Sequence, residues 1–247
     1  MYLKVNGLVL RTTIYNDTDA LLTLLTDNYG KLTVKARGLR KKNSPLVAPC
    51  QLLAFGEFTL FEYKGMYTIN EARSLELFSD LRRDLQKLSL GTYFAQVAEV
   101  ICQEDIPNPE LLSLVLNCLY ALCKLNYSEK HVKATFELRI ACLAGYTPDL
   151  SGCHHCGNTN ADRLDISEGV LVCSTCRAQE HVGIHMPISS GALECIRYIC
   201  LCDPHKILSY SAGEDTMENL SQIAESYLSA QLERGFSTLD FYKSLLY

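Results

Sequence analysis

Hydrophobic and polar residues alternate through the first 80 residues with the two-residue period of β-strands. Five segments rich in Val, Ile, Leu, Thr and aromatic residues follow this period, and turn-forming residues such as Asn, Asp and Gly separate them. The predicted strands cover 3–14, 20–26, 31–37, 52–63 and 66–77. Five short strands in about 80 residues favour a small closed barrel over a sandwich, and the five-stranded OB barrel is the natural candidate.

After residue 80 the spacing of apolar residues changes to the 3.6-residue period of helices. Asn108, Ser128, and Ser189 or Ser190 are predicted N-caps, and Ser237 with Asp240 forms a capping-box-like start for the last helix. The predicted helices begin near residue 81 and cover 110–125, 128–144, 190–202, 216–234 and 238–246. The pattern predicts an α+β multidomain chain, with an OB-fold domain over 1–80 and a helical domain over 81–247.

The composition is that of a globular protein, with 247 residues of which 48% are hydrophobic and 21% charged. The most apolar stretch, 111–125, is interrupted by polar residues, so it predicts a buried helix and no membrane segment. The first residues lack a signal-peptide core. Twelve cysteines in such a chain favour a metal site and buried thiols over disulfides. We therefore expect a cytoplasmic protein.

Four of the cysteines form two Cys-x-x-Cys pairs separated by sixteen residues, which is a spacing typical of zinc sites. Each pair can direct two thiolates at one metal ion, and two pairs complete a tetrahedron. We expect one structural zinc ion within a segment over 150–180, because four thiolates leave no open position for a reacting water. Four unligated thiols or a redox pair remain the alternatives. The predicted ligands are Cys153, Cys156, Cys173 and Cys176.

A basic segment lies within the predicted barrel. The whole chain has a net charge of −5, so it is not uniformly basic. However, residues 31–42 hold six cations and no acid. Such a segment can follow a phosphate backbone, although a solvated hairpin edge has the same composition. Aromatic residues at 15, 29, 58, 61 and 67 could stack on bases or lie in the core. The candidate DNA-binding residues are Lys31, Lys35, Arg37, Arg40, Lys41 and Lys42.

The order of these parts resembles the RecO family of bacterial recombination mediators over nearly the whole chain. The segments similar to that family are 7–10, 18–26, 30–38, 40–44 and 243–246, and the cysteine quartet lies where zinc-bearing members have theirs. The family often has Glu before the Asp of the second strand, where this chain has Thr18. Some members lack the zinc ligands, which supports a structural role for the metal.

The resemblance implies a non-enzymatic protein of DNA repair and homologous recombination. Such proteins bind single- and double-stranded DNA and anneal complementary strands. With RecR, they promote RecA loading on DNA coated by single-strand-binding protein, in the bacterial cytoplasm and at the nucleoid when acting. They also contact the acidic C-terminal tail of the single-strand-binding protein. The candidates for that contact are Lys130, Lys133 and Arg139, on one predicted helix, although a solvated helix face would look the same.

Two other classes of function remain open from the sequence. The first is a zinc-ribbon and OB-fold factor that binds RNA or acts in transcription. The second is a zinc hydrolase or deaminase, which the closed ligand set disfavours. A deaminase would also need a catalytic Glu in a His-x-Glu or Cys-x-Glu motif, and none stands before Cys153. No phosphate-binding loop or nucleophile motif occurs in the sequence.

Overall fold

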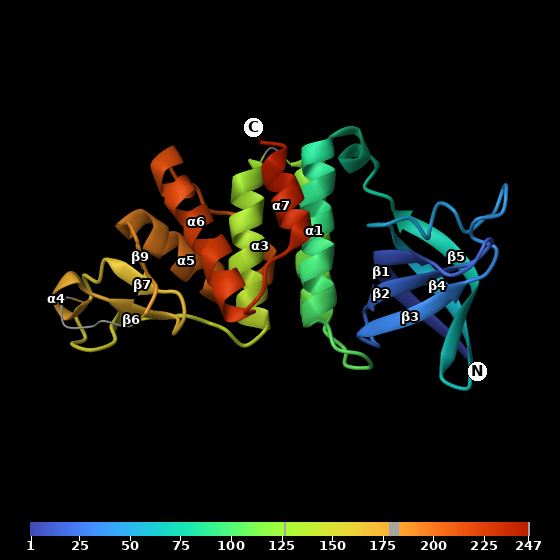
Figure 1. The fold of residues 1–247 in the computed structure, drawn as a ribbon, viewed down its shortest axis with the longest axis horizontal. Coiled ribbons are helices and arrows are strands. Elements are labelled where there is room, and N and C mark those ends of the chain that lie inside the picture. Colours follow the sequence, from blue (N-terminus) through green and yellow to red (C-terminus); the bar gives the residue numbers. More distant parts are fainter. Residues whose placement is uncertain (126, 178–182, 247) are drawn as a thin grey trace. The chain divides into compact units, whose positions relative to one another are not determined.

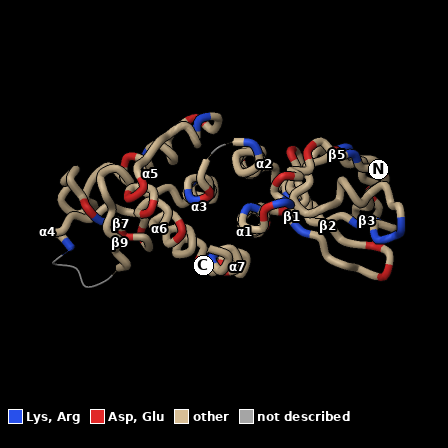
Figure 2. Tube along the Cα trace, turned by 90° about the horizontal axis from the view of Figure 1, so that it is seen from above, with Lys and Arg blue, Asp and Glu red and all other residues tan. Residues whose placement is uncertain are grey.

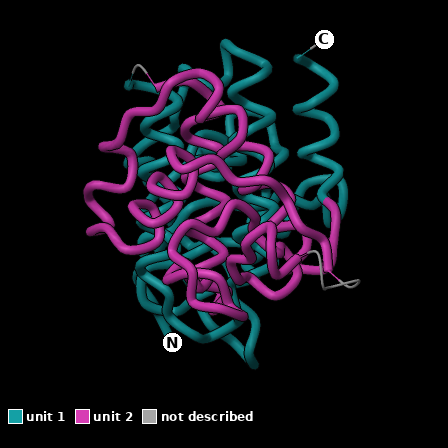
Figure 3. The backbone as a smooth tube through the Cα atoms, turned by 90° about the vertical axis from the view of Figure 1, so that its left-hand side faces the viewer, with its two compact units in different colours: residues 1–125, 236–247 teal, residues 126–235 magenta. Residues whose placement is uncertain are grey.

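A computed structural model describes residues 1–125, 127–177 and 183–246. The chain divides into two compact units, of which the first combines residues 1–125 with 236–247 and the second covers 126–235 (Figure 3). The first unit therefore contains both ends of the chain. The sequence analysis predicted a domain boundary at residue 80, where strands give way to helices. That boundary stays a prediction.

The first unit contains the predicted five-stranded closed barrel (Figure 1). The strands hydrogen-bond in the order β1-β2-β3-β5-β4, and β4 closes the barrel by pairing antiparallel with β1. The pair β3–β5 is parallel, and the other pairs are antiparallel. The strands are β1 (Tyr2–Ile14), β2 (Ala20–Thr26), β3 (Lys31–Ala36), β4 (Phe55–Tyr63) and β5 (Met66–Glu76). Each predicted strand is confirmed to within about three residues at its ends.

The barrel is closed around a core supplied by alternate residues of its strands. Leu22 and Leu24 of β2, Val34 of β3, and Phe58 and Leu60 of β4 are all fully buried. Their neighbours in sequence are half-buried or exposed along β3 and β4. Since successive side chains of a strand point to opposite faces, the polar and aromatic residues between these positions lie on the outside of the barrel.

Three helices and a 3-10 turn complete the first unit. They are η1 (Ser79–Arg83), α1 (Leu85–Ile101), α2 (Pro109–Lys124) and α7 (Ser237–Ser244). Asn108 is the N-cap of α2, where its side chain accepts a hydrogen bond from the N–H of Leu111 at 3.0 Å. This confirms the predicted start of α2. The sequence prediction had placed a single helix start near 81, where the structure has η1 before α1.

The predicted capping box at Ser237 and Asp240 is wrong. The N-cap of α7 is Phe236, and no side chain caps the helix. Its ring packs at the edge of the Tyr93 ring, with centroids 5.6 Å apart. Phe236 is 2% exposed, so apolar packing against α1 fixes the start of α7. The hydroxyl of Thr238 instead donates a hydrogen bond to Gln96 of α1 at 2.6 Å.

The second unit consists of helices and a small sheet. Ser128 and Ser189 are confirmed as the N-caps of α3 and α5. The sheet has the order β6-β8-β7-β9. The elements of the second unit are α3 (Glu129–Leu143), β6 (Asp149–Cys153), β7 (Arg163–Asp165), β8 (Val170–Val172), α4 (Ser174–Arg177), β9 (His185–Pro187), α5 (Ser190–Leu201), η2 (Pro204–Lys206) and α6 (Glu214–Gln231). Among the described residues, no helix has both the length and the apolar character needed to cross a membrane.

Candidate functional site

The basic segment forms the end of β3 and the loop that follows it. Arg37, Arg40, Lys41 and Lys42 are exposed on this loop, which can be followed beside β3 in Figure 2. Within the described part of the chain, the structure gives no ion pair to Arg37, Lys41 or Lys42. We call residues 37–44 the basic loop. The side chains of Arg37, Lys41 and Lys42 can therefore meet phosphate groups in solution.

The two lysines on β3 have partners inside the protein. The Nζ of Lys31 donates a hydrogen bond to the carbonyl oxygen of Glu99 on α1 at 3.2 Å. The Nζ of Lys35 lies 3.1 Å from the Oδ2 of Asp19 and 4.5 Å from the centre of the Tyr15 ring. The structure thus separates the six candidate DNA-binding residues into two structural lysines and four loop cations.

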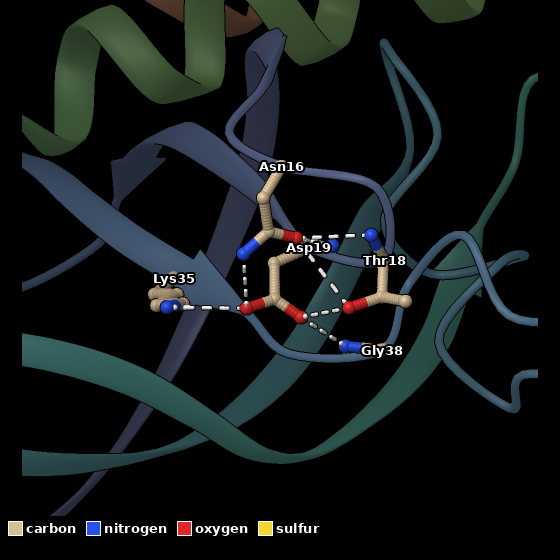
Figure 4. Close-up of polar contacts among 5 residues, drawn as sticks. All are labelled: Asn16, Thr18, Asp19, Lys35 and Gly38. Atoms are coloured by element: carbon tan, nitrogen blue, oxygen red, sulfur yellow. Dashed lines mark hydrogen bonds and ion pairs between the residues drawn. The ribbon is translucent and has the colours of Figure 1, made fainter.

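Asp19 joins the turn between β1 and β2 to the start of the basic loop (Figure 4). Its Oδ1 accepts hydrogen bonds from the N–H of Gly38 at 2.9 Å and from the hydroxyl of Thr18 at 3.0 Å. Its Oδ2 accepts one from Asn16 at 3.2 Å and faces Lys35. These partners, with the Gly38 N–H first and Lys35 second, lower the pKa of Asp19 well below its ordinary value of 3.8.

The same turn holds Arg40 of the basic loop. The N–H of Arg40 donates to the carbonyl oxygen of Thr18 and its guanidinium donates to that of Asn16, both at 3.0 Å. Gly38 has φ of +66°, a backbone conformation that suits glycine. The sequence analysis assigned no role in the site to Asp19 or Asn16. An Asn-Asp-Thr-Asp turn directly before a strand is their only signal, because Gly38 and Arg40, which they bind, follow 19 and 24 residues later.

The aromatic residues considered as stacking candidates occupy different environments. Phe58 is fully buried in the barrel core, so it is unavailable to a ligand. Tyr67 is half-buried, and Tyr15 and Tyr29 are exposed. Phe61 is exposed on β4. Only part of this predicted set can therefore contact a nucleic acid.

The four predicted ligands form one group in the second unit. The Sγ atoms of Cys153, Cys156, Cys173 and Cys176 lie within 4.8 Å of one another, so they could hold a metal ion. Cys153 ends β6, and Cys173 follows β8, which pairs with β6. Gly157 has φ of +71° and donates its N–H to the carbonyl oxygen of Cys153, which forms the tight turn of the first pair. None of the twelve cysteines forms a disulfide.

Within this group the surroundings favour the thiolate of Cys153, whereas side-chain hydrogen bonds with Cys156 and Cys173 raise the pKa of Cys176 to about 12. Burial raises the pKa of Cys153, but hydrogen bonds from the backbone of Cys173, Cys156 and His155 outweigh it and bring the pKa to about 6. The N–H of Cys173 lies 3.3 Å from the Sγ of Cys153. His154 is exposed and does not belong to the group. An arrangement of four thiolates can bind a metal ion and leaves no position for a reacting water.

The three cations considered for partner binding all lie on α3 and all have partners. The Nζ of Lys130 forms an exposed ion pair with Glu218 of α6. Lys133 is 4% exposed and lies 3.0 Å from Glu137 and 2.8 Å from Glu225. The guanidinium of Arg139 donates to the carbonyl oxygens of Ile199 and Cys200 on and near the end of α5, at 3.2 and 2.9 Å. Lys130 is the most accessible of the three.

Two family models match the sequence. One, described as Recombination protein O N terminal, matches residues 1–78, and the other, Recombination protein O C terminal, matches residues 82–240. The chain is 33% identical over 246 residues to a protein of Acetivibrio thermocellus named DNA repair protein RecO, covering 99% of this chain and 97% of the relative. Proteins of the same name from Alkaliphilus metalliredigens and Bacillus pumilus are each 28% identical, over 99% and 92% of this chain and 100% and 88% of their own length.

Proposed function

We propose that this chain, which belongs to the RecO family of DNA repair proteins, is a non-enzymatic mediator of homologous recombination. It binds single- and double-stranded DNA and anneals complementary strands. With RecR, it promotes loading of RecA on single strands coated by single-strand-binding protein. It acts in the bacterial cytoplasm, at the nucleoid. The observation that carries this proposal is the basic loop, whose cations are exposed while its backbone is fixed to the barrel.

Annealing needs charge neutralisation and no bond-making chemistry. Two strands approach against the repulsion of their phosphates, and each phosphate contacted by Lys or Arg releases condensed counterions. Arg37, Lys41 and Lys42 supply such contacts from the basic loop. Asp19 holds the loop in place through Gly38, so the loop loses less conformational freedom when DNA binds. The reaction therefore requires no acid, base or nucleophile in this mechanism.

We propose zinc as the metal of the four-cysteine group, in a structural role. A tetrahedral site with Zn–S bonds of about 2.3 Å requires sulfur atoms about 3.8 Å apart. The Sγ atoms of Cys156 and Cys173 are 3.7 Å apart. The ion would tie the turn after β6 to α4, because metal binding of this kind is coupled to folding. Sulfur-only ligation disfavours Mg²⁺ and Ca²⁺, which prefer oxygen.

We also propose that the acidic tail of single-strand-binding protein docks on the second unit. Lys130 is the candidate that supports this best, since its ion pair with Glu218 is exposed and can exchange. Lys133 supports it least, because an acidic tail would have to displace two carboxylates from a buried ammonium. Arg139 already holds two carbonyl oxygens.

The experiment that tests the proposed function is strand annealing. Two complementary oligonucleotides, one carrying a fluorophore and one a quencher, are mixed with and without the purified protein. Annealing above the spontaneous rate is expected with complementary strands and not with unrelated ones. A spontaneous rate in the presence of protein would contradict the proposal, provided that circular dichroism shows the protein to be folded.

A further inference from the structure

The outside of the barrel carries a row of residues brought together by strand register. Tyr2 of β1 pairs with Phe61 of β4, Phe61 pairs with Thr68 of β5, and Thr68 pairs with Lys35 of β3. Four strands thus contribute one residue each to a line across the sheet. The rings of Tyr2 and Phe61 are in contact, with centroids 5.3 Å apart and planes tilted by 55°.

A second pair lies next to this row at the turn between β4 and β5. Tyr63 pairs with Met66, and Tyr63 lies two residues from Phe61, on the same face of β4. The four apolar side chains are more exposed than core residues of their type: Phe61 is 40% exposed, Tyr63 and Met66 62%, and Tyr2 63%. Contiguous exposed apolar side chains on a soluble protein can mark an interaction or ligand-binding surface.

These residues line a hollow of about 450 Å³. We call it the aromatic hollow. Lys35 and Arg37 also line it, and no acidic side chain does so among the described residues that form it. The hollow therefore combines flat apolar rings with positive charge, and Arg37 belongs to the basic loop as well. Its volume falls within the range of pockets that hold small organic groups.

We propose that the aromatic hollow binds unpaired bases of single-stranded DNA, with Phe61 and Tyr63 as the stacking surfaces and Arg37 as the contact to the adjoining phosphate. This inference rests on the proposed function and adds a site at which single strands are distinguished from duplex. Bases in a duplex are already stacked on their neighbours, so they present no free face to a ring. Stacking on aromatic side chains tolerates any base, which suits a protein that anneals strands of any sequence.

Phosphate binding alone does not explain the aromatic hollow. Exposed cations on the basic loop are sufficient for phosphates, and exposed rings add nothing to that contact. An acidic peptide could pair with Arg37, but it would leave the rings of Phe61 and Tyr63 without a flat partner. Single-stranded DNA supplies both a negative backbone and flat bases at each nucleotide. The rings and the cation of the hollow therefore match the base and the phosphate of a nucleotide.

The first test uses fluorescence, because the chain contains no tryptophan. Tyr63→Trp places a single indole at the aromatic hollow, and Tyr120→Trp places one on α2, where the tyrosine is 49% exposed. An oligothymidine is expected to quench the first indole strongly and the second little. An abasic oligonucleotide of equal length, and inorganic polyphosphate, are expected to quench the first much less. Equal quenching by these base-free polyanions, or by an acidic peptide, would overturn the proposal.

The second test measures affinity with folded variants. Phe61→Leu and Tyr63→Leu keep an apolar side chain and remove the flat ring, and Tyr120→Leu is the matched control. The double variant at 61 and 63 is expected to bind single-stranded DNA at least about fivefold more weakly, with duplex affinity and the salt dependence unchanged. Unchanged single-strand affinity would overturn the aromatic hollow and leave loop-mediated DNA binding intact. Failure of the wild-type protein to bind either form of DNA would instead overturn the proposed function.

Discussion

The Oδ1 of Asp19 accepts a hydrogen bond from the N–H of Gly38 at 2.9 Å, and this bond fixes the point at which the basic loop leaves the barrel. The two residues are 19 positions apart in the sequence. In the proposed function the carboxylate would act on DNA binding at a distance, by positioning a loop whose cations it does not neutralise. By contrast, Asp19 does neutralise Lys35, with which it forms an ion pair that keeps the lysine side chain largely out of the solvent.

The first prediction concerns the acidity of Asp19. The pKa of Asp19 is lowered in the folded protein, so its bonds to Gly38 and Lys35 stabilise the fold fully at pH values above 3.8, the ordinary pKa of Asp. This stabilisation is lost as the pH falls below 3.8 towards the lowered pKa. A titration of the Asp19 carboxyl carbon by NMR should show it ionised at pH 3.8. Lys35→Met should raise the pKa of Asp19 while the Gly38 N–H keeps it below the ordinary value.

Lys4→Met is the control for this titration, since Lys4 pairs with Glu57 and not with Asp19. It should leave the pKa of Asp19 unchanged. Titration of Asp19 at its ordinary value in the wild-type protein would show that the turn does not hold the basic loop as described.

The second prediction concerns salt. Lys41→Gln with Lys42→Gln removes two exposed loop cations without touching Arg40, whose guanidinium holds the loop to Asn16. The slope of log affinity for single-stranded DNA against log salt should become flatter by about 1.4, or about 0.7 for each lost phosphate contact. Arg83→Gln with Lys206→Gln removes the same charge from exposed positions outside the loop and should change the slope little. Equal slopes for the two variants would place the phosphate contacts elsewhere.

The third prediction concerns the buried lysine of α3. Lys133→Met leaves Glu137, which is fully buried, without the ammonium that lies 3.0 Å from it. The free energy of unfolding should fall by about 3 kcal/mol or more. Lys130→Met, which removes an exposed ion pair, should cost less than about 1 kcal/mol. Denaturant unfolding monitored by circular dichroism measures both. Similar small losses for the two variants would mean that Lys133 is not needed to neutralise Glu137.

The fourth prediction concerns the metal. Elemental analysis of the purified protein should give about one zinc per chain. Cys173→Ser should lose the metal and destabilise the second unit, while Cys123→Ser, at a half-buried cysteine outside the group, should retain it. DNA binding by the basic loop should change only indirectly. Full metal content in Cys173→Ser would exclude that cysteine as a ligand.

The sequence predicts the barrel well because its information is local. The two-residue alternation predicts the strand at 52–63 from neighbouring residues alone. The sequence analysis left open which of its aromatic residues lie in the core, and the structure places Phe58 inside and Phe61 outside. The cysteine pairs are equally easy to predict from the sequence, since each Cys-x-x-Cys turn directs its own two ligands at the metal. The start of α7 fails for the opposite reason. Phe236 is fixed by the Tyr93 ring, which lies more than 140 residues earlier in the chain.

The candidate site is harder to predict where charges are concerned. Lys133 and Lys130 lie on one helix and cannot be told apart from the sequence. Lys133 is nevertheless buried, and it is paired there with Glu225, which is 92 positions away in the sequence. Lys31 and Lys35 belong to the same basic run as Lys41, but packing on α1 and the turn at Asp19 engages both. A run of cations in a sequence therefore does not reveal which of them face the solvent.

The most direct test of the account is annealing of complementary strands that are already coated with single-strand-binding protein. The wild-type protein and Arg83→Gln with Lys206→Gln should accelerate annealing of coated strands to a similar extent. Lys41→Gln with Lys42→Gln should be several-fold slower at physiological salt and should recover part of its rate at low salt. No acceleration by the wild-type protein, or full activity of the loop variant, would contradict the claim that the basic loop mediates annealing.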